Sequence, residues 1–207
     1  MGDLFPQSIE TDRLRLESIR SDRLDVLELY EICSSDPGID EVTAHLTWSP
    51  HETPKETLEF VTEARTNHES GETGTYVIRP RDGEAGAGEI AGLCGFETDW
   101  KRRTMSLGIW LRRRFWGRGY SSERAAAFVA LAFERLGLDL VSVSADVENE
   151  RSNRAIRTYV DAHGGRRDGL VRNWIVVNGE PTDCYRYSIS RTEWRESGAD
   201  VAVTFLE

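Results

Sequence analysis

The sequence predicts a single α+β domain, in which a mixed, mostly antiparallel sheet is flanked by helices. Two observations support this fold class. Three strand-like segments separated by turn-forming residues occupy the middle of the chain, and a helix, a short buried strand, a second helix and a closing hairpin follow them. A length of 207 residues fits one domain. We place that domain at residues 1–195 and treat 196–207 as a C-terminal tail.

The first part of the chain predicts one strand and two helices. Residues 9–17 alternate apolar and charged side chains, as a strand with one solvent-facing side does. A helix capped by Ser21 or Asp22 is expected to run past Tyr30 and to end at residues 36–38. Residues 39–50 are expected to form a loop. A capping box at residues 53–56, with proline at the first helical position, predicts a second helix to about residue 68.

The rest of the chain alternates between segments with the apolar spacing of strands and segments with that of helices. Strands are predicted at residues 75–79, 89–96 and 104–111, with turns at 82–88 and 98–101. Apolar residues at helical spacing predict helices over 122–136 and 150–163, with a buried strand at 141–145 between them. Strands at 170–177 and 184–189 flank a turn and close the sheet.

The charge of the chain is unevenly distributed. The formal net charge is −10, which disfavours nucleic acid and anionic membranes as partners. Residues 101–135, however, hold nine basic and two acidic side chains, a local charge of +7. Only two of the 26 basic residues are lysines, a bias that suits either a salt-adapted, halophilic protein or GC-rich codon usage. A small polyanion is therefore expected to bind at 101–135.

Other classes of protein find little support. No run approaches the about 18 apolar residues of a membrane span, and the N-terminus lacks a signal-peptide pattern, so a cytoplasmic location is expected. Three cysteines without CxxC spacing indicate neither a disulfide framework nor a zinc site, and no metal is expected. The four histidines are isolated in the sequence and are interpreted as surface or core residues. No HExxH or GxSxG motif is present.

Residues 108–123 carry the clearest chemical signal. A predicted strand leads into an arginine-rich turn with glycines at Gly117 and Gly119, and a helix begins directly afterwards. Glycines let backbone amides converge on an anion, and a helix N-terminus adds further free amides. Three consecutive arginines, residues 112–114, can supply charged partners for phosphate oxygens. This pattern predicts a diphosphate-binding loop that differs from a Walker loop, because its GK[ST] sequence is missing.

The loop resembles the R/Q-x-x-G-x-G/A signature of the GNAT acyltransferases, with Arg114, Gly117 and Gly119 at the defined positions. Around it, nearly the whole chain resembles the branch of ribosomal-protein N-terminal acetyltransferases (RimJ/RimL-like). The matches are residues 10–16, the cluster 116–120 with Glu123, residues 149–154, and, in the closing hairpin, residues 169–173, 178–179, 183 and 185–188. The resemblance implies the GNAT fold and acetyl-CoA as co-substrate.

The resemblance also implies a cofactor site and assigns residues to it. The asparagine of the N-x-x-S element contacts the pantetheine arm and its serine lies near the thioester, which corresponds to Asn149 and Ser152; capping of the following helix is an alternative role for Asn149. The implied cofactor-binding set is Leu111, Arg112, Arg114, Trp116, Gly117, Arg118, Gly119, Tyr120, Asn149 and Ser152.

Candidates for proton transfer are less well defined. Many GNAT enzymes use a tyrosine on the helix at 150–163 as the acid for the departing thiolate, which makes Tyr159 a catalytic candidate beside Ser152, although a core aromatic is an equal reading. A base must take the proton of the amine, and Glu97 and Asp99 are the nearest carboxylates by topology. A solvated turn is the alternative for both. The hairpin position that carries a glutamate in some members is Ile175 here.

The implied reaction is direct transfer of acetyl from acetyl-CoA to an amine. The expected acceptor is the N-terminal α-amine of a protein, bound by the segment 39–50 with Trp48 and by the hairpin with Arg172 and Asn173. Alternatives are a small-molecule amine, such as a polyamine or an aminoglycoside, and a non-catalytic acyl-CoA sensor. The protein is expected to be a monomer or a homodimer.

Overall fold

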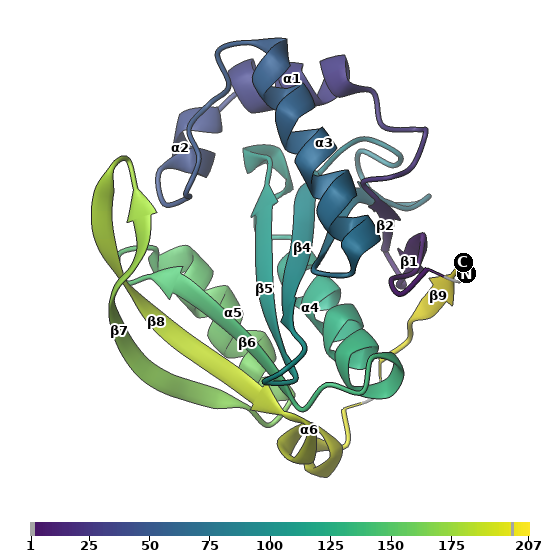
Figure 1. Ribbon diagram of the computed structural model, residues 1–207, viewed down its shortest axis with the longest axis vertical. Coiled ribbons are helices and arrows are strands. Elements are labelled where there is room, and N and C mark those ends of the chain that lie inside the picture. The colour runs from purple at the N-terminus through teal and green to yellow at the C-terminus, as the bar shows by residue number, and fades with distance from the viewer. Residues whose placement is uncertain (1–2, 200) are drawn as a thin grey trace.

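A nine-stranded sheet with helices on both faces forms the protein in a computed structural model, which describes residues 3–199 and 201–207 (Figure 1). The strand order is β7-β8-β6-β5-β4-β3-β2-β1-β9. The neighbouring pairs are antiparallel except for β5 and β6, which run parallel. This is the predicted mixed, mostly antiparallel sheet.

The strands are β1 (Ser8–Glu10), β2 (Leu14–Ser18), β3 (Thr73–Pro80), β4 (Gly92–Asp99), β5 (Thr104–Leu111), β6 (Leu140–Asp146), β7 (Arg166–Val177), β8 (Glu180–Ser190) and β9 (Thr204–Leu206). The helices are α1 (Val26–Ser35), α2 (Ile39–Thr43), α3 (Pro54–Ser70), α4 (Tyr120–Ala130), α5 (Glu150–Ala162) and α6 (Arg191–Ser197).

The N-terminal region differs from the sequence prediction. A single strand over 9–17 is wrong: the Thr11 hydroxyl accepts the Leu14 amide at 3.1 Å, and the chain reverses there into the antiparallel strands β1 and β2. The loop predicted at 39–50 is also partly wrong, because it begins with α2. Gly38 precedes that helix with a φ of 87°, which favours glycine.

The helix ends follow the local signals that the sequence carries. The capping box of α3 is present between Thr53 and Glu56, with Pro54 in the first turn. The helix predicted at 122–136 begins two residues earlier, at Tyr120, and its last turn, Leu131–Arg135, is a π-helix. Gly137 follows with a φ of 67°. At the C-terminal end, Thr204–Leu206 pairs with β1, so part of the segment 196–207 extends the sheet.

Two apolar clusters hold the helices on the sheet. The larger one lies between the sheet and the helices α4 and α5, where Phe96 and Phe128 stack edge to face with ring centroids 5.0 Å apart. The smaller one joins α1 and α3 to the other face through residues such as Leu29, Val61 and Leu93. Burial of these side chains provides the main stabilisation of the fold.

The parallel strands β5 and β6 stay together over only part of their length. They pair from Thr104 and Leu140 to Leu107 and Val143, whereas β5 stays paired with β4 up to Leu111 and β6 stays paired with β8 up to Asp146. The sheet therefore opens between the last residues of β5 and β6. We call this gap the splay; in Figure 1 it separates the upper half of β5 from β6 and β8.

Candidate active site

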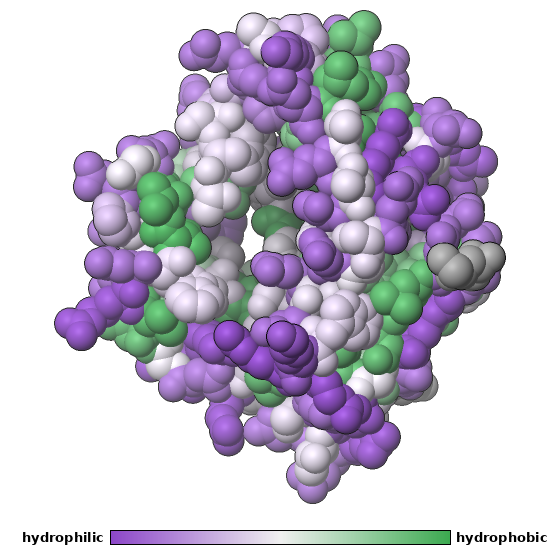
Figure 2. All heavy atoms as spheres, in the orientation of Figure 1, coloured by the Kyte–Doolittle hydropathy of each residue, from purple (hydrophilic) through white to green (hydrophobic). Residues whose placement is uncertain are grey.

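The splay forms a hollow that is open to solvent. Figure 2 shows the surface hollowed between the part that covers β5 and the part that covers β8 in Figure 1. Gly108, the first residue of β5 beyond the paired region, is exposed, and a Cβ atom added there would meet nothing within 4 Å. The backbone edge of β5 from Gly108 onwards faces this space without a strand partner.

A row of free backbone amides lies where β5 passes into α4. Gly117 and Gly119 have φ values of 76° and 79°, which glycine adopts without strain. Within the described residues, the amides of 117–121 donate no hydrogen bond to protein acceptors. A Cβ atom on Gly117 would also meet nothing within 4 Å. Five free amides beside open space at a helix N-terminus can bind an anion such as a diphosphate.

The three consecutive arginines of this loop do not add free charge to that row. Each guanidinium is bound by a carboxylate: Arg112 by Asp36, Arg113 by Glu41 at 2.9 Å, and Arg114 by Glu89. These side chains brace the loop against the two segments that flank it. The positive field expected from 112–114 is therefore neutralised locally, and the backbone amides are the main donors for an anion.

Two other contacts fix the loop. The Trp116 indole donates to the Leu111 carbonyl at 2.8 Å and closes the turn. The guanidinium of Arg151, in the first turn of α5, stacks on the Trp116 ring with its carbon 3.8 Å from the ring centroid. Arg151 is exposed and forms no ion pair with a described residue. It is therefore a cation beside the amide row that is available for a phosphate.

Two buried side chains, one on α5 and one on α4, have polar atoms without a hydrogen-bond partner among the described residues. The Tyr159 hydroxyl forms no hydrogen bond, and burial raises its pKa to about 12. Arg124, on α4, is 1% exposed, and its Nε and Nη1 atoms are unpaired. Arg124 lies close enough to Tyr159 to oppose the rise in its pKa. Unpaired polar groups in a core are costly, so these two side chains are candidates for binding a ligand.

The first turn of α5 presents one capping side chain and one free hydroxyl. Asn149 is the N-cap, and its Oδ1 accepts the Ser152 amide at 3.0 Å. The capping role that the sequence left open is thus confirmed, and the Asn149 side-chain NH₂ group stays available for another partner. The half-buried Ser152 hydroxyl forms no hydrogen bond within the described part of the chain.

A histidine and an aspartate that are 101 residues apart meet at the open end of the splay. His45 Nδ1 lies 2.6 Å from Asp146 Oδ2. Asp146 is the last residue of β6 and is 6% exposed, whereas 32% of the His45 side chain is exposed. The interpretation of His45 as an isolated histidine is therefore wrong, because it is paired across the splay.

Comparison with known proteins decides the family. A model of the acetyltransferase (GNAT) domain matches residues 13–159. The chain is a GNAT acetyltransferase. It is 24% identical over 189 residues to the N-acetyltransferase p20 of Bacillus licheniformis, covering 91% of this chain and 98% of that protein. It is 31% identical over 115 residues to YdaF of Bacillus subtilis, which is named as a ribosomal N-acetyltransferase, covering 54% and 61%.

Solved structures agree with this fold. The ribosomal L7/L12 α-N-protein acetyltransferase RimL, solved with coenzyme A, superposes with a TM-score of 0.72 at 21% identity, covering 87% of this chain and 95% of that one. Acetyl transfer is thus the activity of the family to which the protein belongs, and its fold is the GNAT fold that the sequence predicted.

The predicted acceptor residues lie in two separate segments of the acetyltransferase. Trp48 packs on Trp110 of β5, with ring centroids 5.4 Å apart, so the segment after α2 lies over the splay strand. Arg172 and Asn173 are exposed in an irregular part of β7, where Asn173 has a φ of 49° and donates its amide to Asp183. Glu97 is exposed beside Ser106, where β5 still pairs with β6.

Sequence reasoning missed four residues of this acetyltransferase site. Arg124 and Arg151 belong to helices whose periodicity is clear, but nothing in the sequence indicates that one is buried and the other stacks on the loop. His45 and Asp146 meet only in the folded chain. The one available signal was Asp146 itself, a charged residue at the end of a strand predicted to be buried.

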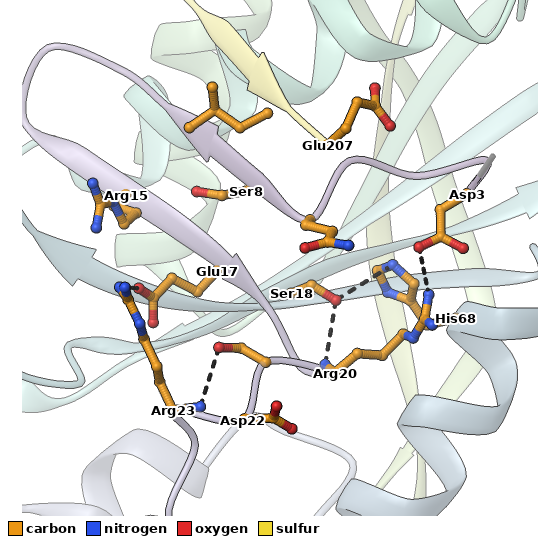
Figure 3. A pocket seen from close by; sticks show the side chains of 13 residues that line it. Asp3, Ser8, Arg15, Glu17, Ser18, Arg20, Asp22, Arg23, His68 and Glu207 are labelled. Atoms are coloured by element: carbon orange, nitrogen blue, oxygen red, sulfur yellow. Dashed lines mark hydrogen bonds and ion pairs between the residues drawn. The ribbon is translucent and has the colours of Figure 1, made fainter.

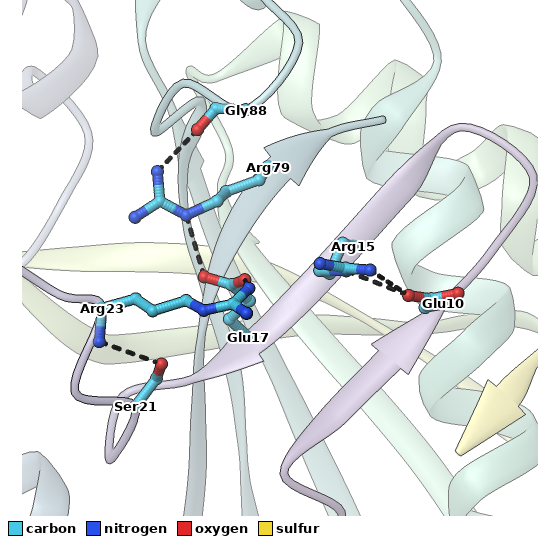
Figure 4. Close-up of polar contacts among 7 residues, drawn as sticks. All are labelled: Glu10, Arg15, Glu17, Ser21, Arg23, Arg79 and Gly88. Carbon is cyan, nitrogen blue, oxygen red and sulfur yellow. Dashed lines mark hydrogen bonds and ion pairs between the residues drawn. The ribbon is translucent and has the colours of Figure 1, made fainter. Parts of the chain in front are cut away.

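Two other hollows lie at the β1–β2 edge of the sheet, with volumes of about 640 and 490 Å³. The arginines that line them are all paired with carboxylates. Glu17 binds Arg79 at 2.9 Å and Arg23 at 3.3 Å, and Glu10 binds Arg15 at 2.6 Å (Figures 3 and 4). These ion pairs leave no arginine of the described lining free for an anion, so we place no ligand in either hollow.

Within the described residues, no helix is both long and apolar enough to cross a membrane. The described part of the chain also contains no cluster of three or more potential metal-binding side chains.

Proposed function

We propose that this acetyltransferase transfers acetyl from acetyl-CoA to the N-terminal α-amine of a cytoplasmic protein, of the ribosomal-protein type. The observation that carries the proposal is the splay, a hollow that is open to solvent, together with the five free amides that follow β5, the strand at its border. The names of YdaF and RimL support the choice of acceptor. A mouth open to solvent suits a chain end, which can enter while the rest of the acceptor stays outside.

In this proposal the amides of 117–121 bind the pyrophosphate, and Arg151 adds a cation beside them. The free edge of β5 from Gly108 onwards and the side-chain amide of Asn149 offer hydrogen bonds to the pantetheine arm. The thioester then lies in the splay near Ser152 and Tyr159. Arg112, Arg114 and Arg118 contribute by fixing the loop, since each is already bound to a carboxylate or a carbonyl oxygen.

The reaction requires the amine nitrogen to bond to the thioester carbon while the carbon–sulfur bond breaks. The chain must take a proton from the nitrogen and stabilise the thiolate that leaves. With a pKa of about 12, Tyr159 keeps its proton at neutral pH and can donate a hydrogen bond to that thiolate. Tyr159 therefore acts as a hydrogen-bond donor, and solvent protonates the thiolate.

A second candidate acceptor is a small polycationic amine. Residues outside 101–135 carry the acidic excess of the chain, which attracts cations to the surface around the site. Polyamines and aminoglycosides fit that acidic excess, whereas they do not require the open mouth of the splay.

Release of free thiol from acetyl-CoA, measured with separate acceptors, tests the proposal. The panel contains N-terminal peptides, the same peptides with blocked α-amines, spermidine and an aminoglycoside. We expect release with free peptides only, and mass spectrometry should find acetyl on the α-nitrogen. Release with spermidine or the aminoglycoside alone would favour the small-molecule candidate. Tight acetyl-CoA binding without release by any acceptor would identify a sensor and overturn the proposal.

A further inference from the structure

The pair of His45 and Asp146 has the geometry of a catalytic dyad. The 2.6 Å contact joins a nitrogen of a half-exposed imidazole to an oxygen of a buried carboxylate. In the described part of the chain, His45 has no other hydrogen-bond partner, so its Nε2 atom is not used by the protein. A buried carboxylate on one ring nitrogen and an accessible second nitrogen are what a histidine base needs.

Asp146 is held rigidly. Its Oδ1 atom accepts the Glu148 amide at 3.0 Å, and its backbone carbonyl accepts the Asn153 side chain at 2.7 Å. Only Oδ2 is left for His45. The carboxylate therefore cannot turn away from the histidine without losing its bond to the Glu148 amide, and it fixes the orientation of the ring.

His45 reaches Asp146 from the opposite side of the splay. It follows α2, and α2 is attached to the loop after β5, because Glu41 binds Arg113 and Gly38 packs on the Arg113 side chain. Asp146 lies three residues beyond Val143, the last residue of β6 that pairs with β5. The contact therefore joins the β5 side of the splay to its β6 side at the open end. It lies on the face of the sheet where Trp48 covers Trp110.

We propose that His45 is the catalytic base that takes the proton of the acceptor amine, and that Asp146 is its positioning residue. Asp146 accepts the Nδ1–H bond, so the lone pair of His45 is on Nε2. As the amine nitrogen bonds to the thioester carbon, Nε2 accepts one proton from that nitrogen. The electron pair of the broken carbon–sulfur bond leaves on the thiolate. The resulting imidazolium is stabilised by the Asp146 carboxylate and returns its proton to water.

The proposal replaces Glu97 as the candidate base. Glu97 is exposed beside Ser106, in the closed part of the sheet, whereas the dyad lies at the end where β5 and β6 have separated. It rests on acetyl transfer to an amine, which the family shows, and not on the choice of acceptor. A failed acceptor assignment would therefore leave it testable with any amine that the enzyme accepts.

The test compares a basic amine with hydroxylamine, a nucleophile that is already neutral near pH 7. We expect His45→Gln to lower kcat for the basic amine by about 100-fold or more, the usual contribution of a general base. The loss with hydroxylamine should be much smaller, and the Kd of acetyl-CoA should not change. Asp146→Asn should show the same selective loss, to a smaller extent. His51→Gln is the matched control, because His51 is bound to Thr57 and faces no carboxylate across the splay.

Two results would overturn the proposal. Unchanged kcat in His45→Gln would show that another group takes the proton. Equal losses with the basic amine and with hydroxylamine, together with a lower melting temperature, would show that the pair only ties the two sides of the splay together. Thermal unfolding of each variant separates the second result from a true loss of the base.

Discussion

The carboxylate of Glu123 binds Arg13 through both its oxygens. Oε1 accepts the Arg13 backbone amide at 2.8 Å, and Oε2 accepts Nε at 2.8 Å and Nη2 at 2.6 Å. The remaining nitrogen, Nη1, donates to the Arg118 carbonyl at 2.9 Å. The turn between β1 and β2 thus holds the amide row from outside, through a residue in the first turn of α4. A carboxylate at that end of a helix is also favoured by the helix dipole.

Replacing Glu123 with glutamine should therefore weaken both the fold and the cofactor loop. We expect the free energy of unfolding to fall by roughly 2–3 kcal/mol, because a charge-assisted, half-buried network loses its charge. The Kd of coenzyme A should rise, since the Arg118 carbonyl is held by Arg13, and Glu123 holds Arg13 in place.

The control is Glu59→Gln, which breaks the exposed pair of Glu59 with Lys55 and should cost less than about 0.5 kcal/mol. Urea unfolding and calorimetric titration measure the two effects. Equal effects of the two substitutions would contradict the prediction.

This contact also explains which parts of the fold the sequence could predict. The capping box of α3, the bounds of β5 and the glycine-rich start of α4 depend on neighbouring residues, and the sequence shows them directly. The reversal at Thr11 could not be predicted in the same way. It depends on one short-range hydroxyl bond and on Glu123, which is 112 residues away and binds the Thr11 hydroxyl at 2.6 Å.

The candidate site also has features that the sequence predicts and features that only the folded structure shows. The amide row follows from the positions of Gly117 and Gly119, which the sequence identified. The sequence could not predict the carboxylate partners of Arg112, Arg113 and Arg114, because these carboxylates come from distant segments. Periodicity places Arg124 on α4, but only the packed structure shows that it is buried and that its Nε and Nη1 atoms lack a hydrogen-bond partner among the described residues.

Gly117→Ala should distinguish the stability cost of a strained backbone from an effect on coenzyme A binding. The φ of 76° makes an alanine there costly by about 1–2 kcal/mol. Because a Cβ meets no protein atom within 4 Å, a further effect on coenzyme A binding would come from the ligand itself. Gly198→Ala is the matched control, since Gly198 has a φ of 65° and equally open surroundings after α6. We expect similar losses of stability and a higher coenzyme A Kd for Gly117→Ala only. An unchanged Kd would contradict the assignment of the loop.

Tyr159→Phe should lower kcat without destabilising the protein. The hydroxyl has no hydrogen-bond partner among the described residues. Its removal therefore breaks no hydrogen bond and takes an unpaired polar group out of the core. We expect an unchanged or slightly higher melting temperature and a kcat at least about 10-fold lower, because the thiolate loses a donor. The rate of thiol release measures kcat, and differential scanning calorimetry measures the melting temperature. A normal kcat would make Tyr159 a core aromatic only.

Arg124→Met should stabilise the protein in the absence of ligand. Methionine fills a similar volume, and it removes a buried guanidinium that has no carboxylate partner. We expect the free energy of unfolding to rise by about 1–3 kcal/mol. Arg79→Met provides the contrast, because Arg79 is bound to Glu17 and to the Gly88 carbonyl and its loss should be destabilising. A lower stability of Arg124→Met would show that this guanidinium has a stabilising partner in solution.

His68 should make the stability of the protein fall in mild acid. The ring is 4% exposed and stacks against Phe5 and Tyr76, and burial, with help from the nearby Arg20, lowers its pKa to about 4 (Figure 3). In the unfolded chain a histidine binds its proton near pH 6.5. Between these two pH values the unfolded state holds more protons than the folded state, so the free energy of unfolding decreases as the pH is lowered.

The expected loss is about 2 kcal/mol between pH 7.5 and pH 4.5, below the full value of the shift because pH 4.5 still lies above the pKa of the folded state. His68→Gln should remove this part of the slope between pH 6.5 and 5. Lower values are avoided because Glu56 and Glu193 also have lowered pKa values and begin to titrate there. Urea unfolding of both proteins at four pH values measures the slopes. If the two slopes are equal, His68 is not the group that responds, and the slope in this range belongs to another group, such as His51, whose pKa burial also lowers.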